Sequence, residues 1–168
     1  MRTGLLALAS GLLVAPVACT SYDPEERIDP AVGQQGDDFF PVALVLVDKC
    51  GSIDCHGSKY RNFRLYGYSS QRLDPLAKPS AGEMTKEEAV ENYNSLVALE
   101  PQLIQQVIRE GGAKPDRLTF MRKAREHEAH KGGKPITEGD NADLCLQSWL
   151  QSQVRGDLCR LAVPRLNR

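Results

Sequence analysis

Five cysteines constrain the fold of this 168-residue chain more than any other residue type: Cys19, Cys50, Cys55, Cys145 and Cys159. The chemistry open to them depends on the compartment, because thiols pair as disulfides outside the cytoplasm and stay reduced inside it. An odd number of cysteines in an exported protein also leaves one that needs a separate explanation. The destination of the chain therefore decides what these residues can do.

The first 18 residues have the layout of a secretory signal. Arg2 provides an early positive charge, an apolar run extends from Leu5 to Val17, and the small residue Ala18 precedes Cys19. The apolar run is too short, and wrongly flanked, for a membrane span. We predict that residues 1–18 are removed on export.

The junction of Ala18 and Cys19 resembles the lipobox of bacterial lipoproteins, in which the cysteine becomes the acylated first residue of the mature chain. Pro16 stands where that pattern usually has leucine. The alternative is ordinary signal cleavage nearby, with Cys19 left as a free thiol. We favour lipidation, because it leaves the other four cysteines as two pairs. The resemblance implies an exported protein that is anchored at the periplasmic side of the inner or outer membrane through Cys19.

The rest of the chain suits one small domain. Residues 19–38 are polar, contain proline and glycine, and lack apolar periodicity, so we predict a flexible tether there. We expect a single domain over residues 39–160 and a C-terminal tail over 161–168. Removing Arg2 with the signal leaves 20 Lys and Arg against 22 Asp and Glu, a net charge near −2. This balance gives no sign of a nucleic-acid partner.

Apolar periodicity predicts a mainly α domain with long ordered loops. The segment 39–50 has six apolar residues after Pro41, a pattern that allows a helix or a buried strand. Thr85 and Glu88 form a capping-box pattern before a helix, and a second helix starts near Pro101 and stops near Gly111. Two further helical segments are expected, one with Asp116 as its cap and a last one over residues 139–154.

The segment CGSIDCHG, residues 50–57, joins two cysteines to a histidine. In a covalent haem site two cysteine sulfurs form thioethers with the haem vinyl groups, and the adjoining histidine binds the iron. Cys55 and His56 keep that adjacency, but four residues separate Cys50 from Cys55 where the haem c signature has two. The Gly-Ser-Ile-Asp insert can bulge outward if both sulfurs still reach their vinyl groups.

Two other interpretations of this segment remain open. A disulfide between Cys50 and Cys55 is favoured by export and would leave His56 as an ordinary polar residue. A zinc site would use the two cysteines with histidines, but the histidine spacing and the oxidising compartment disfavour it. The disulfide is the stronger rival.

Residues from about Phe40 to Leu150 resemble the small cytochrome c-like domains of bacterial lipoproteins and multidomain surface proteins. The shared features are an apolar segment leading into C..CHG, an RLYG-like segment, a P.RL.FMRKA element, an H.GG loop and a closing helix with an apolar-Trp-Leu step. The resemblance implies a mainly α, cytochrome c-like domain that carries one haem c on Cys50, Cys55 and His56. It also favours a helix over residues 39–50.

The resemblance further implies a sixth iron ligand, either a methionine or a histidine in a glycine-bearing loop. His130, in the sequence AHKGG, fits the second pattern and is our preferred ligand. Met121 is the alternative, although its apolar neighbours equally suggest core packing. Met84 is less favoured because it precedes a helix cap, and His127 is expected to be a solvated surface residue.

The second cysteine pair has a simpler interpretation. Cys145 lies on the apolar side of the last predicted helix, and Cys159 follows the sequence RGD, which we take as a helix stop. A disulfide between them would pin the C-terminal segment back onto the helix, and we expect the final RLNR to be frayed. The chain has no Gly-rich phosphate loop, Gly-x-Ser-x-Gly elbow or zinc-protease helix, so we do not expect an enzyme.

Two functions from different classes follow. The first is an exported, lipid-anchored, c-type cytochrome-like module that binds one haem and exchanges electrons with an unidentified redox protein. The second is a haem-free structural or interaction lipoprotein that keeps the scaffold and joins Cys50 to Cys55. The adjacency of Cys55 and His56 and the HKGG loop favour the first. The four-residue gap and the lack of a clear methionine ligand favour the second.

Overall fold

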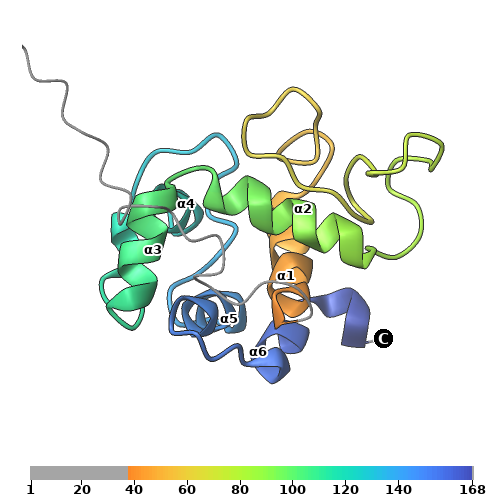
Figure 1. Ribbon diagram of the computed structural model, residues 1–168. Coiled ribbons are helices and arrows are strands. Elements are labelled where there is room, and N and C mark those ends of the chain that lie inside the picture. The colour runs from red at the N-terminus through yellow and green to blue at the C-terminus, as the bar shows by residue number, and fades with distance from the viewer. Residues whose placement is uncertain (1–37, 168) are drawn as a thin grey trace, which may run out of the picture.

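The computed structural model describes residues 38–167, which form six α-helices joined by long loops (Figure 1). The helices are α1 (Phe40–Cys50), α2 (Lys86–Val97), α3 (Pro101–Arg109), α4 (Thr119–Ala124), α5 (Asn141–Leu150) and α6 (Gly156–Leu161), with 3₁₀ turns η3 (Pro115–Arg117) and η4 (Pro164–Asn167). This part of the chain contains no β-strand, only one isolated bridge between Tyr66 and Gln71. The prediction of a mainly α chain is confirmed.

The predicted signal, the lipidation site Cys19 and all of the predicted tether except Asp38 lie outside the described residues. Among residues 38–167, no helix has the length and apolar character needed to cross a bilayer.

Helix α1 is the centre of the fold. It packs against α2 on one side and against α5 and α6 on the other (Figure 1). Five of its residues are buried: Val42, Ala43, Val45, Leu46 and Val47. Pro41 lies in the first turn, where its missing N–H has no intrahelical partner. A helix that is buried on most of its sides is apolar almost throughout, which explains why this segment lacks the usual amphipathic pattern.

An aromatic cluster joins α1 to its neighbours. The ring of Phe39, just before α1, meets Tyr93 of α2 at a centroid distance of 5.2 Å and Trp149 of α5 at 5.3 Å, both edge to face. All three side chains are at most 3% exposed. Edge-to-face aromatic pairs add to the stability that burial alone provides. The start of α1 is therefore fixed by two helices that are distant in sequence.

Helix α2 organises the long loop that precedes it. The predicted capping box is confirmed, with Glu88 N donating to Thr85 Oγ1 and Thr85 N donating to Glu88 Oε2. The buried Glu88 carboxylate also accepts from Arg72 Nε at 2.6 Å and from the backbone N–H of Leu73 at 3.1 Å. One turn further, the side chain of Asn92 accepts from Tyr66 N and donates to Tyr66 O. These side-chain hydrogen bonds fix the loop, which has no regular secondary structure of its own.

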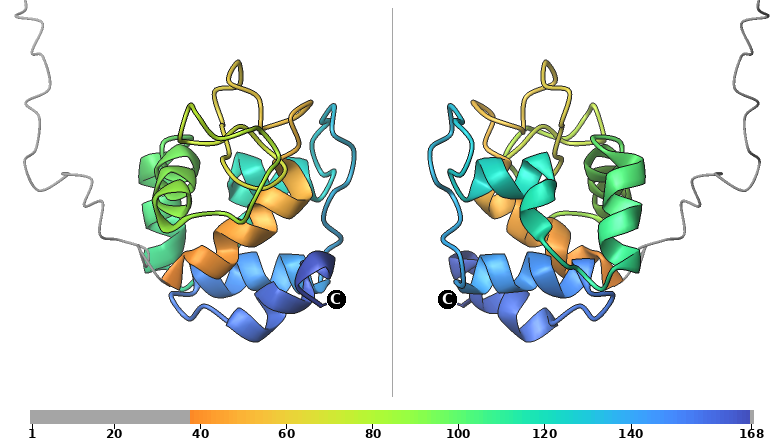
Figure 2. Two further views of the ribbon diagram at one scale, coloured as in Figure 1. Left: turned by 90° about the vertical axis from the view of Figure 1, so that its right-hand side faces the viewer. Right: turned by 90° about the vertical axis from the view of Figure 1, so that its left-hand side faces the viewer.

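The long loops and the C-terminal helices lie at different ends of the molecule. The loops that follow α1 gather at one end, away from α5 and α6, and the loop between α4 and α5 runs along the side between these ends (Figure 2). Helix α3 ends as predicted, with Gly111 in the left-handed conformation at φ 66° just beyond it. The long loops therefore surround the end of α1 that carries Cys50.

The prediction that Asp116 caps a helix is wrong. Helix α4 begins only at Thr119, whose backbone N–H and side-chain hydroxyl both donate to the carboxylate of Glu100, just before α3. Asp116 lies in η3 and pairs with the buried guanidinium of Arg125 at 2.9 Å, and Arg125 also pairs with the fully buried Asp143. The carboxylate of Asp116 is thus used in an ion pair rather than in a cap.

The disulfide between Cys145 and Cys159 is confirmed, and it links α5 to α6. The RGD sequence is not a helix stop, because α5 already ends at Leu150 and Gly156 begins α6. The expectation of a frayed end is wrong at Arg165, whose guanidinium lies 3.8 Å from the centroid of the Tyr68 ring and pairs with Glu83 at 2.7 Å. The C-terminal segment is therefore docked on the loop before α2.

Replacing Cys145 and Cys159 together by alanine is expected to lower the free energy of unfolding by about 3 kcal/mol, because the bridge closes a 14-residue loop and limits the unfolded chain. Denaturant unfolding of oxidised wild type and the double variant measures the loss. A loss below about 0.5 kcal/mol, typical of surface changes, would contradict this role.

The substitution Asn92→Ala is expected to cost about 3 kcal/mol, because it removes a buried side chain and leaves two backbone groups of the half-buried Tyr66 without their partner. Asn94 lies exposed on the same helix, so Asn94→Ala is the matched control and is expected to stay within about 0.5 kcal/mol of wild type. Thermal or denaturant unfolding distinguishes the two. Equal losses would contradict the role of Asn92.

Candidate functional site

The four-residue insert forms a closed turn at the end of α1. Helix α1 ends at Cys50, and the N–H groups of both Cys55 and Gly57 then donate to Ser52 O at 2.9 Å. The N–H of His56 donates back to Cys50 O at 3.1 Å. Because the turn folds outward and returns, Cys55 and His56 come back beside Cys50 despite the longer spacing.

Gly57 allows this return by its lack of a side chain. A Cβ at this position would lie 2.2 Å from Gly51 O and 2.8 Å from Ser70 Cα. The Ser70 hydroxyl donates to Gly51 O, and the N–H of Gln71 donates to Gly57 O at 3.0 Å. The turn is therefore packed directly against the loop at residues 70 and 71, and only glycine fits between them.

The ring of His56 is fixed by the backbone. Its Nδ1 lies 2.9 Å from Phe63 O, and a ring N–H that donates to this carbonyl leaves Nε2 as the nitrogen that can accept or bind a metal. The Phe63 ring lies beside it at a centroid distance of 4.7 Å. Burial lowers the pKa of His56, which favours the neutral imidazole that a metal requires.

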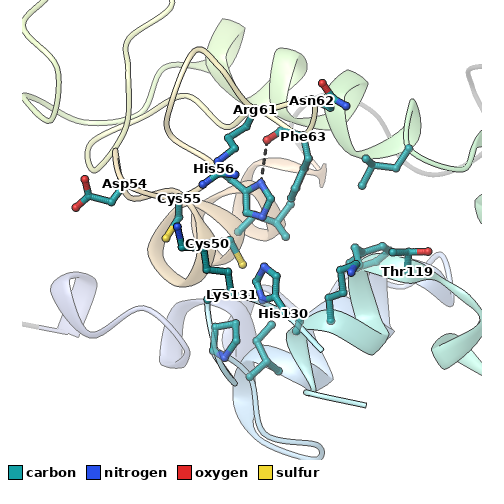
Figure 3. A pocket seen from close by; sticks show the side chains of 18 of the residues that line it. Cys50, Asp54, Cys55, His56, Arg61, Asn62, Phe63, Thr119, His130 and Lys131 are labelled. Carbon is teal, nitrogen blue, oxygen red and sulfur yellow. Dashed lines mark hydrogen bonds between the residues drawn. The ribbon is translucent and has the colours of Figure 1, made fainter. Parts of the chain in front are cut away.

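His130 faces His56 across the site (Figure 3). The two ring centroids are 6.0 Å apart and the ring planes differ by only 13°. Two imidazole nitrogens that share one metal ion are each about 2 Å from it, which places the ring centroids about 6 Å apart. The separation of the two histidines thus matches that of a pair on one metal ion.

A cavity of about 700 Å³ opens around these two rings. Its wall includes both cysteines of the motif and the two histidines, and half of the other lining residues are apolar: Leu46, Phe63, Leu99, Phe120, Ala124, Pro135, Ile136 and Leu146. Its size lies within the range of small-molecule and cofactor sites, about 300–1,000 Å³. Residues from α1, α4, α5 and three loops therefore converge on one largely apolar space.

The two cysteines of the motif are separate thiols, unlike Cys145 and Cys159. Burial, followed by the neighbouring Cys55, raises the pKa of Cys50 to about 12, so this group is protonated at neutral pH. The disulfide that would define the haem-free alternative is not formed in this structure.

The other candidate ligands lie elsewhere. Met121 is fully buried in the core and is not among the residues that line the cavity. Met84 is also buried, next to the amide of Asn92 at 3.6 Å. His127 is exposed and lies 3.3 Å from an Asp116 oxygen, as expected of a surface residue. Within residues 38–167, no three or more His, Cys, Asp or Glu side chains converge as ligands of a bare metal ion.

Two supporting groups could not be found from the sequence. Phe63 contributes its backbone carbonyl, which any residue carries, so no sequence signal identifies it. Gly132 lies against the His130 ring, and a Cβ there would be 2.7 Å from His130 Cε1. The HKGG pattern indicates a turn, but only the structure shows that one of its glycines limits the position of the imidazole.

Comparison with known proteins adds no assignment. The sequence matches no protein-family model, and no curated protein or solved structure is significantly similar to it.

The substitution Gly132→Ala is expected to displace the His130 ring, because the new methyl group would overlap it. NMR of ¹⁵N-labelled histidine should show shifted ring resonances for His130 and His56, with a stability change below about 0.5 kcal/mol at this exposed position. The control is Gly156→Ala, where a Cβ meets open space and neither ring should respond. Unchanged histidine spectra in Gly132→Ala would contradict the contact.

Proposed function

We propose that this protein is an exported, lipid-anchored, c-type cytochrome-like electron-transfer module that binds one haem. In this proposal Cys50 and Cys55 form the two thioethers, and His56 and His130 are the axial ligands. The observation that carries it is the pair of facing imidazoles, 6.0 Å apart, in an apolar cavity that both free thiols also line.

The residues of the cavity fit this group in three respects. The closed turn brings two thiols and the adjoining imidazole to one wall, as covalent haem attachment needs. The opposite wall provides the imidazole of His130, whose ring centroid lies 6.0 Å from that of His56. Half of the remaining lining residues are apolar, which suits a large planar macrocycle. When bound, haem supplies a one-electron iron couple.

The chain's own residues orient the histidine ligand and exclude water from the cavity. The carbonyl of Phe63 fixes the orientation of His56 and raises its basicity as a ligand. The apolar side chains of α1, α4 and α5 keep water from the cavity, and burial is one of the factors that set a haem potential. Two imidazole ligands favour a lower potential than a histidine and methionine pair.

The charges of the cavity wall favour a protein partner with an acidic surface. The cavity wall carries Arg61 and Lys131 against the single carboxylate of Asp54, while its third cation, Lys123, pairs with Glu128 at 2.7 Å. The chain as a whole has a net charge of −1, so this excess is local. Complementary charge at a docking site raises association rates and selects partners.

The test is production of the exported protein together with the haem-attachment machinery. Wild type is expected to give a pyridine haemochrome spectrum and an intact mass equal to the chain plus one haem. Replacing Cys50 and Cys55 together by alanine should abolish covalent attachment, because both thioethers are lost. A wild-type mass equal to the chain less two hydrogens per disulfide would instead support the haem-free lipoprotein.

The axial ligand is tested in the same preparation. His130→Ala should keep covalent haem but lose the low-spin, six-coordinate visible spectrum, because one axial nitrogen is removed. Met121→Leu is the matched control for the alternative ligand, since it preserves core volume and should leave the spectrum unchanged. The opposite result, an altered visible spectrum in Met121→Leu and a wild-type spectrum in His130→Ala, would reject His130 as the axial ligand.

A further inference from the structure

The two facing histidines are supported very differently. His56 is held on three sides: its ring by Phe63 O, its N–H by Cys50 O, and its carbonyl by the N–H of Leu65. His130 has no such support at its ring, because its buried Nδ1 has no hydrogen-bond partner among residues 38–167. A histidine that binds a metal firmly usually donates its second ring N–H to a fixed acceptor. By this criterion His56 is a permanent ligand and His130 a weakly held one.

His130 lies on a segment that is attached mainly at its ends, residues 126–135, here named the His130 strap. At one end, the N–H groups of His127 and Glu128 donate to Arg122 O at 2.9 and 3.3 Å. At the other end, the N–H of Ile136 donates to Ala124 O at 3.2 Å. Between these points the described backbone hydrogen bonds include only one, from Gly133 N to His130 O within the strap itself. The strap can therefore lift from the cavity without breaking a helix.

Two side chains tie the strap to α4 near His130. Lys123 Nζ donates to Ala129 O at 3.5 Å, and Glu128 makes the stronger tie. The carboxylate of Glu128 pairs with Arg122 Nε at 3.0 Å and with Lys123 Nζ at 2.7 Å. Arg122 is itself held by the carbonyls of Asp116 and Arg117. The Glu128 side chain is 40% exposed, so each ion pair shifts an equilibrium by only about 1.5- to 5-fold. This attachment is strong enough to favour the docked strap and weak enough to be released.

We propose, on the basis of the haem-binding function above, that His130 is a displaceable ligand and that a small neutral diatomic molecule binds in its place, with Glu128 limiting how often the strap lifts. The exchange replaces one neutral donor by another and needs no oxidant or reductant. A small neutral ligand suits the apolar side chains around the rings, because it adds no charge to the cavity.

Carbon monoxide is the probe. The reduced, haem-loaded protein is mixed with carbon monoxide in a stopped-flow spectrometer, and the observed rate is expected to reach a plateau set by dissociation of His130. Glu128→Gln should raise this plateau about fivefold, because both ion pairs are lost. Glu126→Gln is the matched control: Glu126 is exposed on the same strap and is found in no ion pair among the described residues, so the plateau should stay at the wild-type value. In His130→Ala the rate should rise linearly with carbon monoxide.

Two results would overturn the proposal: no spectral change of wild type at saturating carbon monoxide, or equal plateaus for Glu128→Gln and Glu126→Gln. A second readout needs no haem. In the haem-free protein, NMR relaxation of ¹⁵N-labelled histidine should show a more mobile His130 ring in Glu128→Gln than in Glu126→Gln, with His56 unchanged. A preparation that never binds haem refutes the proposed function, and equal His130 mobility in the two variants then refutes the strap independently.

Discussion

The contact of Gly57 with the end of α1 is the constraint on which the rest of the site depends. Because a Cβ would overlap the carbonyl of Gly51, only glycine lets the chain turn back tightly enough to bring Cys55 and His56 beside Cys50. The same turn presents its carbonyls to the loop at Ser70 and Gln71. The geometry of the cysteines and the histidine is thus a property of backbone packing, and the two residues beyond the usual spacing are accommodated in the turn.

Buried polar side chains fix the loops by accepting hydrogen bonds from their backbone and donating hydrogen bonds to it. Glu88 and Asn92, one turn apart on α2, hold the backbone of residues 66 to 73, and Arg125 joins η3 to α5 through carboxylates. Each group is satisfied, so its burial costs little. Loops fixed in this way can line a cavity with a stable shape, which explains how a chain with long irregular segments still positions two imidazoles in nearly parallel planes.

The sequence allowed the local elements to be predicted, because their signals are local. The capping box at Thr85 and the glycine stop at Gly111 follow from spacing, and the cysteine pair at 145 and 159 follows from the assignment of the other three cysteines. The misplaced cap at Asp116 shows the limit of this reasoning. From the sequence alone, a carboxylate before an apolar run fits a helix cap as well as an ion pair. For Asp116 the position of Arg125 in the folded structure decides in favour of the ion pair. The facing of His56 and His130 was expected from a resemblance, but the supports at Phe63 and Gly132 depend on folded contacts.

The central claim is that His56 and His130 share one iron atom. X-ray absorption at the iron edge of the purified, exported protein tests it most directly, because the nearest shells report ligand elements and distances. The account predicts iron bound only by nitrogen, four atoms from the macrocycle and two from imidazoles. A sulfur atom in the first shell, or a native protein without iron and with Cys50 joined to Cys55, would contradict it.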